Sequence, residues 1–175
     1  WEYRYLKTIL MREESIDSSM MLLSADRAFA QEGYPRLTRL PNSSVELRPY
    51  DVIVTGDVPA TYFSAEQLAL LRDHVAINGA GIIWIGGEYQ TPRTYDNTTL
   101  EDLLPMTNPA AVQRVDPALG AIHMRPQPLA EALNVLRLRS NPGADLRARA
   151  AAPAWPKDLP PFEWAQDIGR LKPTT

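Results

Sequence analysis

The chain has 175 residues, 45% hydrophobic and 22% charged, a composition that fits an ordinary globular domain and argues against a disordered or fibrous protein. Its 18 basic and 21 acidic residues give a net charge of −3, too weak and too mixed for a surface that binds nucleic acid or an anionic membrane. The absence of cysteine excludes disulfides, thiolate catalysis and zinc–cysteine sites.

The chain begins with a predicted amphipathic helix that ends near Ser15. Its apolar residues recur at helical spacing: Trp1, Tyr5, Leu6, Ile9 and Leu10. The apolar run 20–23 suits a strand covered on both faces, with a buried helical turn as the alternative. A brief helix over 26–32, a loop over 33–42 and a single helical turn over 43–47 are expected next. No apolar run approaches the ~20 residues that span a bilayer, and no signal-peptide pattern is present.

Residues 51–85 predict a βαβ unit. Its two strands, 51–57 and 81–85, are apolar, and the first is rich in β-branched residues. Between them, Ser64 and Gln67 form a capping-box pattern at the start of a helix. Since the crossover of such a unit is almost always right-handed, we expect two parallel strands, and parallel strands are normally buried on both faces.

The second half of the chain carries weaker signals and most of the 16 prolines. Thr98 and Glu101 repeat the capping-box pattern and predict a helix that Pro105 ends. Neither an internal repeat nor a domain boundary is evident, so we expect a single domain over 1–175. The remaining expectations are short strands at 111–115, 122–125 and 135–138, a connector over 147–156 and an extended segment over 159–164.

Four candidate site residues lie just beyond the carboxyl ends of the two predicted parallel strands. Asp57 follows the first strand, and Gly86, Gly87 and Glu88 follow the second. Open α/β sheets bind ligands in this crevice, where two carboxylates could bind a cation or a sugar hydroxyl, or form an acid/base pair. The alternative is that Asp57 caps a turn and Glu88 is solvated. The two glycines could also cradle an anion, although no pattern for nucleotide binding accompanies them.

Other polar residues give weaker indications. Glu2 and Arg4 of the first helix could line the same crevice, with a surface ion pair as the alternative. His74 is expected on the solvent side of its helix, and His123 is expected to be structural. Because no His, Asp or Glu cluster has ligand spacing, we expect no metal, and the sequence indicates no other cofactor.

The loop 88–99 is the expected place for specificity, because rigid scaffolds present function on such loops. Aromatic residues in this loop and later in the chain are expected to cover the edge of the core, with a binding surface as the alternative: Tyr89, Tyr95, Trp155, Phe162 and Trp164.

Several short motifs together resemble the class I glutamine amidotransferase-like domains of large bacterial membrane-anchored proteins. The matching residues are spread over nearly the whole chain: 1–6 (WEYRYL), 22–26 (LLSAD), 50–57 (YDVIVTGD), 103–105 (LLP) and 169–173 (GRLKP). The resemblance implies a flavodoxin-like parallel sheet with helices on both faces, in which Gly86-Gly87 lies where true amidotransferases carry their nucleophile. It also implies further strands outside the chain, so that one or both ends of the domain are missing.

The lost nucleophile separates the chain from active amidotransferases, because amide transfer needs a thiolate and an activating histidine. We therefore expect a non-catalytic binding or assembly module of a larger membrane-tethered protein, with a protein or another segment of the same chain as its partner. The domain itself is expected to be soluble; its compartment stays open, with the periplasm as one alternative. The alternative function is a hydrolase or carbohydrate-active enzyme that uses Asp57 and Glu88. A purely structural piece that completes the sheet of a partner is a third hypothesis.

Overall fold

The computed structural model describes residues 2–23, 31–116, 121–125, 127–132 and 160–173. The chain divides into two units, one formed by residues 1–113 with 166–175 and the other by 114–165. Among the described residues, both helices and short strands are present, so the protein is a mixed α/β structure. Three two-stranded sheets are present in these ranges, and one of them is parallel.

The predicted βαβ unit is confirmed in the first unit. Strand β3 (Val52–Thr55) pairs in parallel with β4 (Gly81–Trp84), and α3 (Ala65–Ala76) connects them. The register pairs Val52 with Gly81 and Thr55 with Trp84. The predicted capping box is present at the start of α3, where the side chain and backbone of Ser64 each bond to Gln67.

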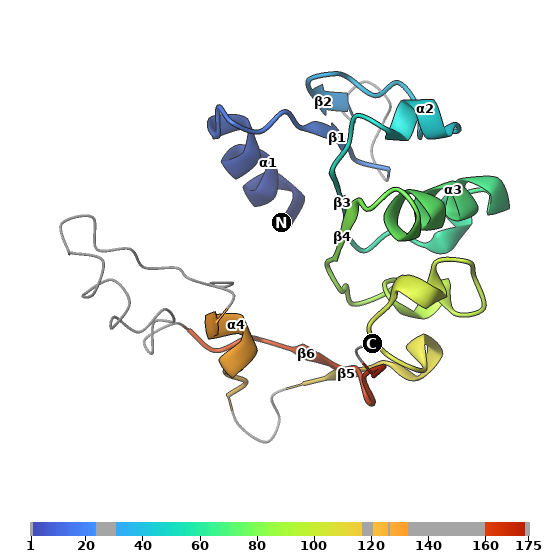
Figure 1. Ribbon diagram of the computed structural model, residues 1–175. Helices are drawn as coiled ribbons and strands as arrows, with labels where there is room; N and C mark the ends of the chain where they lie inside the picture. The colour runs from blue at the N-terminus through green and yellow to red at the C-terminus, as the bar shows by residue number, and fades with distance from the viewer. Residues whose placement is uncertain (1, 24–30, 117–120, 126, 133–159, 174–175) are drawn as a thin grey trace. The chain divides into compact units, whose positions relative to one another are not determined.

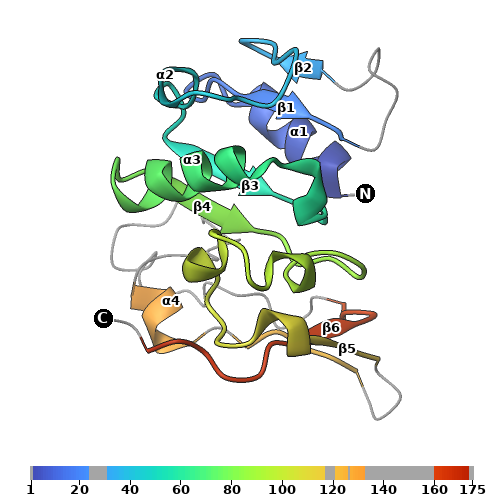
Figure 2. The ribbon, with the colours of Figure 1, turned by 90° about the vertical axis from the view of Figure 1, so that its right-hand side faces the viewer.

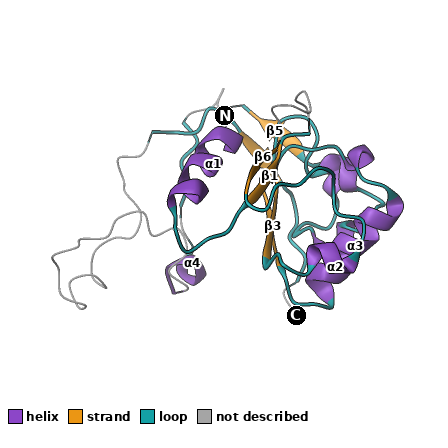
Figure 3. Ribbon diagram, turned by 90° about the horizontal axis from the view of Figure 1, so that it is seen from above, coloured by secondary structure: helices purple, strands orange, loops and turns teal. Residues whose placement is uncertain are grey.

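The expectation that these two strands are buried on both faces is wrong. Exposure alternates along both strands, because successive side chains point to opposite faces of a sheet. One face carries Ile53 and Trp84 and is half-buried, whereas Val54 and Ile83 on the other face are exposed. Figures 1 and 3 show α3 on one side of the sheet and α1 (Glu2–Arg12) on the other. The exposed side chains show that α1 leaves this second face uncovered.

The predicted strand at 20–23 is present as β1 (Ser19–Met21), which pairs antiparallel with β2 (Gln31–Gly33). The predicted helix over 26–32 is wrong at its end, because residues 31 and 32 belong to β2, and 26–30 lie outside the described residues. Strand β2 ends at Gly33, whose φ of +88° and close approach to the Ser18 carbonyl suit only glycine. The predicted turn over 43–47 is confirmed as α2 (Ser44–Leu47), capped by Ser43.

The hydrophobic core of the first unit gathers around Tyr95 and the 3₁₀ turns that follow β4. These turns are Arg93–Tyr95, Glu101–Leu103 and Pro109–Ala111. The helix predicted from Thr98 and Glu101 is only the second of these turns, because the Glu101 carboxylate accepts from the Asn97 N–H instead of closing a capping box with Thr98. The buried core residues are Ala60, Leu68, Tyr95, Leu100, Leu104, Met106 and Val112.

The last described segment returns to this core. Met106 and Leu171 form an antiparallel bridge, and the Thr107 N–H donates to the Arg170 carbonyl at 3.0 Å. The Lys172 ammonium donates to the Glu101 carbonyl at 2.6 Å. Figure 2 shows the red C-terminal segment alongside the yellow 3₁₀ turns. Two of the motifs behind the resemblance, 103–105 and 169–173, are therefore neighbours in space.

The second unit is described only in part. Its elements include α4 (Pro128–Ala132) and most of β5 (Gln113–Val115), which confirms the strand predicted at 111–115 and pairs with β6 (Ala165–Asp167). The strand predicted at 122–125 is reduced to one bridge between Ile122 and Phe162. The strand predicted at 135–138, the connector over 147–156 and Trp155 lie outside the described residues.

Candidate functional site

Asp57, the first candidate site residue, organises the loop that follows β4. One carboxylate oxygen accepts the N–H groups of Gln90 at 2.7 Å and Thr91 at 2.8 Å, and the other accepts the N–H of Tyr89 at 3.1 Å. A carboxylate that accepts from three consecutive backbone N–H groups caps the turn through charge-assisted hydrogen bonds. Both oxygens of Asp57 are thus engaged in holding the loop.

Gly86 and Gly87 are needed where they stand because other groups occupy the space of a side chain. A Cβ on Gly87 would lie 2.0 Å from Cγ of Asp57, and a Cβ on Gly86 would lie 2.3 Å from Oε1 of Gln166. Gly87 is buried as well. At Gly87 the turn therefore has no room for a nucleophilic side chain unless Asp57 moves, which would release the three N–H groups of the loop.

Gln166 is part of the same cluster and was not anticipated from the sequence. Its side-chain amide donates to the Gly87 carbonyl at 2.7 Å and to the Thr91 carbonyl at 2.8 Å. These contacts tie the two ends of the 87–91 segment together through its carbonyls, whereas Asp57 holds its N–H groups. No local pattern could have revealed them, because 79 residues separate Gln166 from Gly87.

The loop after Gly87 is further fixed by two of its own side chains. Thr91 is 1% exposed, and its hydroxyl donates to the Gly56 carbonyl at 2.8 Å. The guanidinium of Arg93 donates to the carbonyls of Glu88 and Tyr89. The Tyr89 side chain, by contrast, is 68% exposed. The arrangement is a rigid loop that presents one aromatic ring to solvent.

The remaining predicted site residues take different positions. Glu88 is half-buried within the loop, next to the Asp57 cluster. Arg4 is exposed on α1, and no described residue bonds to its guanidinium. Glu2 begins α1, and its side chain is outside what the structure describes. The described contacts thus unite Asp57, Gly86 and Gly87, with Glu88 beside them in sequence, but do not bring Arg4 to them.

Tyr95, at the end of the 3₁₀ turn that follows this cluster in the chain, is completely buried. Its hydroxyl donates to the Val58 carbonyl at 3.0 Å, and its ring meets that of Trp84 edge-on, with centroids 4.9 Å apart. Burial, and to a smaller extent the negative charge of Asp57, raises the pKa of the Tyr95 phenol well above its usual value. The phenol is therefore a neutral structural donor, and the aromatic residue expected at the edge of the core lies at its centre.

The prediction that His74 is a surface residue is wrong. Its side chain is 4% exposed, and Nε2 lies 2.7 Å from the Tyr50 carbonyl, which fixes the proton on this nitrogen. Nδ1 is buried, and no described residue forms a hydrogen bond with it. His123 is exposed, so the expected structural role has no burial to support it.

A polar pocket of about 430 Å³ adjoins His74, at the opposite ends of the strands from Asp57. Arg48 from the end of α2 and Asp51 from the start of β3 line it with opposite charges, beside the amide of Asn78. This pocket is therefore not the crevice that was expected at the carboxyl ends of the strands.

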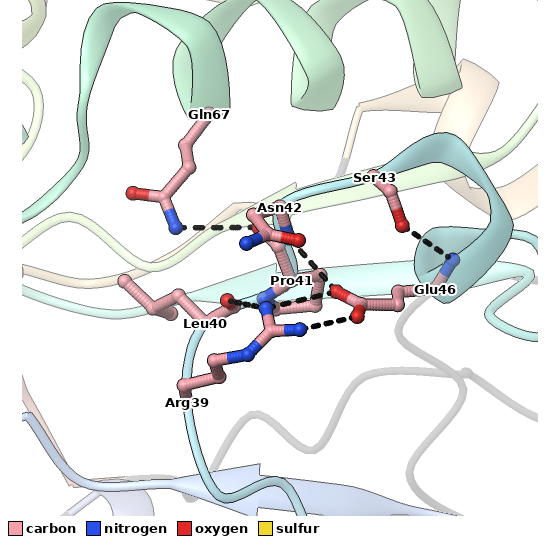
Figure 4. A network of polar contacts seen from close by, with 7 residues as sticks. All are labelled: Arg39, Leu40, Pro41, Asn42, Ser43, Glu46 and Gln67. Carbon is pink, nitrogen blue, oxygen red and sulfur yellow. Dashed lines mark hydrogen bonds and ion pairs between the residues drawn. The ribbon is translucent and has the colours of Figure 1, made fainter.

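A second polar network braces α2 against α3 (Figure 4). The Glu46 carboxylate accepts from the Arg39 guanidinium and from the Asn42 N–H at 2.9 Å, and the Gln67 side chain donates to the Pro41 carbonyl at 3.3 Å. The hydrogen bond from Arg39, followed by that from Asn42, lowers the pKa of Glu46. All these partners lie within or next to short loops, so the network is a structural brace.

Comparison with known proteins adds no identification, since no protein-family model, curated protein or solved structure matches the chain. Among the described residues, no group of three or more His, Asp or Glu side chains could hold a metal ion. In the same part of the chain, every helix is too short or too polar to cross a bilayer. The residues themselves therefore carry the functional argument.

Proposed function

We propose that the chain is a non-catalytic binding or assembly module, a flavodoxin-like, amidotransferase-like domain within a larger membrane-tethered protein of the cell envelope. The proposal rests on the structural role of the Asp57 side chain in the turn after β4. Its carboxylate holds three backbone N–H groups, and it fills the space that any side chain at Gly87 would need. Under the proposed relationship, this structural turn stands where an amidotransferase would carry its nucleophile.

The same cluster supports binding as the function. Asp57, Thr91 and Gln166 fix the loop before any partner arrives, so little conformational entropy is lost when the loop is bound. Tyr89 at the start of the loop supplies a large exposed ring with a polar tip, a residue type enriched at protein interfaces. A protein partner that contacts Tyr89 is the proposed ligand class.

The alternative, a hydrolase or carbohydrate-active enzyme with Asp57 and Glu88 as acid and base, has less support. A general acid or base must be free to exchange a proton with substrate, but both oxygens of Asp57 already accept hydrogen bonds from the loop. Replacing Asp57 by Asn should therefore lower the free energy of unfolding by roughly 1–3 kcal/mol, because an amide NH₂ would face backbone donors. The enzyme hypothesis instead requires activity that Asp57→Asn abolishes while stability is kept.

The first experiment measures ammonia release from glutamine by the purified chain, with Glu88→Gln and Asp57→Asn as variants. We expect no turnover above the blank, and glutamine-dependent release lost on a single substitution near Gly87 would overturn the proposal.

The second experiment places a photo-cross-linking residue at position 89 in cells that produce the protein, with position 34 as the matched control, because Tyr34 is 79% exposed. One defined protein captured at position 89 but not at 34, and bound again by the purified chain, supports the module. Equal capture at both positions would contradict it.

A further inference from the structure

The uncovered face of the β3–β4 sheet is a departure from the usual architecture of parallel sheets. Val52, Val54 and Ile83 on this face are 52%, 39% and 53% exposed. The register places Val54 directly beside Ile83, so the three side chains form one continuous apolar surface. Parallel strands almost always have both faces covered, because both carry apolar side chains that gain free energy on leaving water.

Helix α1 has an apolar surface of its own on the same side of the sheet. Ile9 is 65% exposed, and Leu6 and Leu10 beside it on the helix are half-buried. Figure 1 shows α1 on the side of β3 and β4 away from α3, and Figure 3 shows the same arrangement around β3. Eleven residues make a helix about 16 Å long, and four residues make a strand about 13 Å long. The helix therefore has the length to cover both strands.

The connection between α1 and the sheet permits this contact. The Tyr50 hydroxyl donates to the Ser19 hydroxyl at 3.0 Å, which ties the start of β1 close to the residue pair that precedes β3. Between Arg12 and Ser19 the linker is residues 13–18, exposed except at residue 18. Six residues reach about 20 Å at most, enough for α1 to move across the face but too little for it to leave.

We infer that α1 is a hinged cover for this sheet face, closing through Ile9 onto Val52, Val54 and Ile83 of the same chain. The structure holds the cover open, with both apolar surfaces exposed. Closing buries apolar area on both sides, because Ile9, Leu6 and Leu10 share one side of the helix. Arg4 lies off that side, and Arg12, one turn after Ile9, lies at its edge, where a long side chain keeps its charge in water. Any partner of this face would have to displace α1. The inference does not depend on the proposed function, which concerns the Asp57 turn and Tyr89.

The absence of cysteine makes a disulfide test clean. The double variant Ile9→Cys, Val54→Cys reports closure, and Met11→Cys, Val54→Cys is the matched control. Met11 is apolar and 59% exposed, but two residues along the helix it points about 200° away from Ile9. Each single variant is made alongside, and circular dichroism checks that every variant is folded.

Oxidation is followed at micromolar protein by non-reducing electrophoresis and mass spectrometry. We expect the Ile9/Val54 pair to form an intramolecular disulfide at least about tenfold faster than the Met11/Val54 pair, because docking raises the effective concentration of the two thiols. Equal rates for the two pairs would overturn the inference. So would a disulfide that forms only between chains, since it would assign the cover to a second copy.

Discussion

The two faces of the β3–β4 sheet differ in almost every respect. One packs towards α3 and the core, where Trp84 meets the buried ring of Tyr95. The other exposes Val54 and Ile83 to solvent. Both faces belong to the same two strands, and both carry apolar, β-branched residues. Composition alone therefore does not decide which face becomes core. The difference teaches that the later segments of the chain, which fold back onto one face only, determine where the stability of the sheet resides.

The largest predicted effect tests this difference directly. Tyr95→Ala should lower the free energy of unfolding by roughly 3–5 kcal/mol, because it opens a cavity in the core, whereas Val54→Ala should cost less than about 1 kcal/mol. Urea unfolding of both variants provides the comparison. The small cost at Val54 fits a cover that is closed for only part of the time, whereas a large cost would mean that α1 is closed over the second face for most of the time.

The next prediction concerns the turn beside the packed face. Gly87→Ala should destabilise the protein by roughly 1–3 kcal/mol, because the new Cβ collides with the Asp57 carboxyl group. Gly56→Ala is the matched control, since a Cβ there meets no atom within 4 Å and its φ is not positive. Thermal unfolding of both variants is the measurement. Equal losses at the two glycines would refute the steric explanation.

A smaller effect is expected where Gln166 reaches Gly86. Gly86→Ala alone should cost roughly 1–2 kcal/mol, because it displaces the Gln166 amide from the carbonyls of Gly87 and Thr91. In a Gln166→Ala background the same substitution should be nearly neutral. A double-mutant cycle measures this coupling, and additive costs would show that the two residues act independently.

The smallest effect lies in the exposed brace of Glu46 and Arg39. Because the folded-state pKa of Glu46 is lowered, its contribution to stability is present above the ordinary pKa of 4.5 and is lost as the pH falls through the folded value. Arg39→Ala should raise the pKa of Glu46 towards 4.5, as followed by NMR titration of the carboxyl group. If the pKa of Glu46 is the same in Arg39→Ala as in the unchanged protein, the hydrogen bond from the Asn42 N–H alone accounts for the lowered pKa.

Those parts of the fold that depend on neighbouring residues could be predicted from the sequence. The capping box of Ser64 and Gln67 fixed the start of α3, and the apolar runs of β3 and β4 determined the parallel pair. His74 was misjudged because helical periodicity gives no information on the Tyr50 carbonyl, 24 residues earlier. The flavodoxin-like arrangement stays a prediction, since two parallel strands are shared by many folds.

The candidate site was found in part. Asp57, Gly86 and Gly87 do come together, because residues at the carboxyl ends of adjacent parallel strands must meet. The sequence left two interpretations of Asp57, and the structure favours the turn cap over a free carboxylate. Gln166 was beyond reach because a contact across 79 residues leaves no trace in local spacing.

The return of the C-terminal segment has a consequence for the timing of synthesis. Gln166 and Lys172 follow their partners Gly87 and Glu101 by 79 and 71 residues. At roughly 5–20 residues per second, a ribosome needs about 4–16 s between them. During that interval the Gly87 and Thr91 carbonyls lack their hydrogen bonds from the Gln166 amide, and the core lacks the C-terminal segment that packs against it. Maturation of this unit is therefore a late event, and a stalled or prematurely released chain would be a substrate for chaperones and proteases.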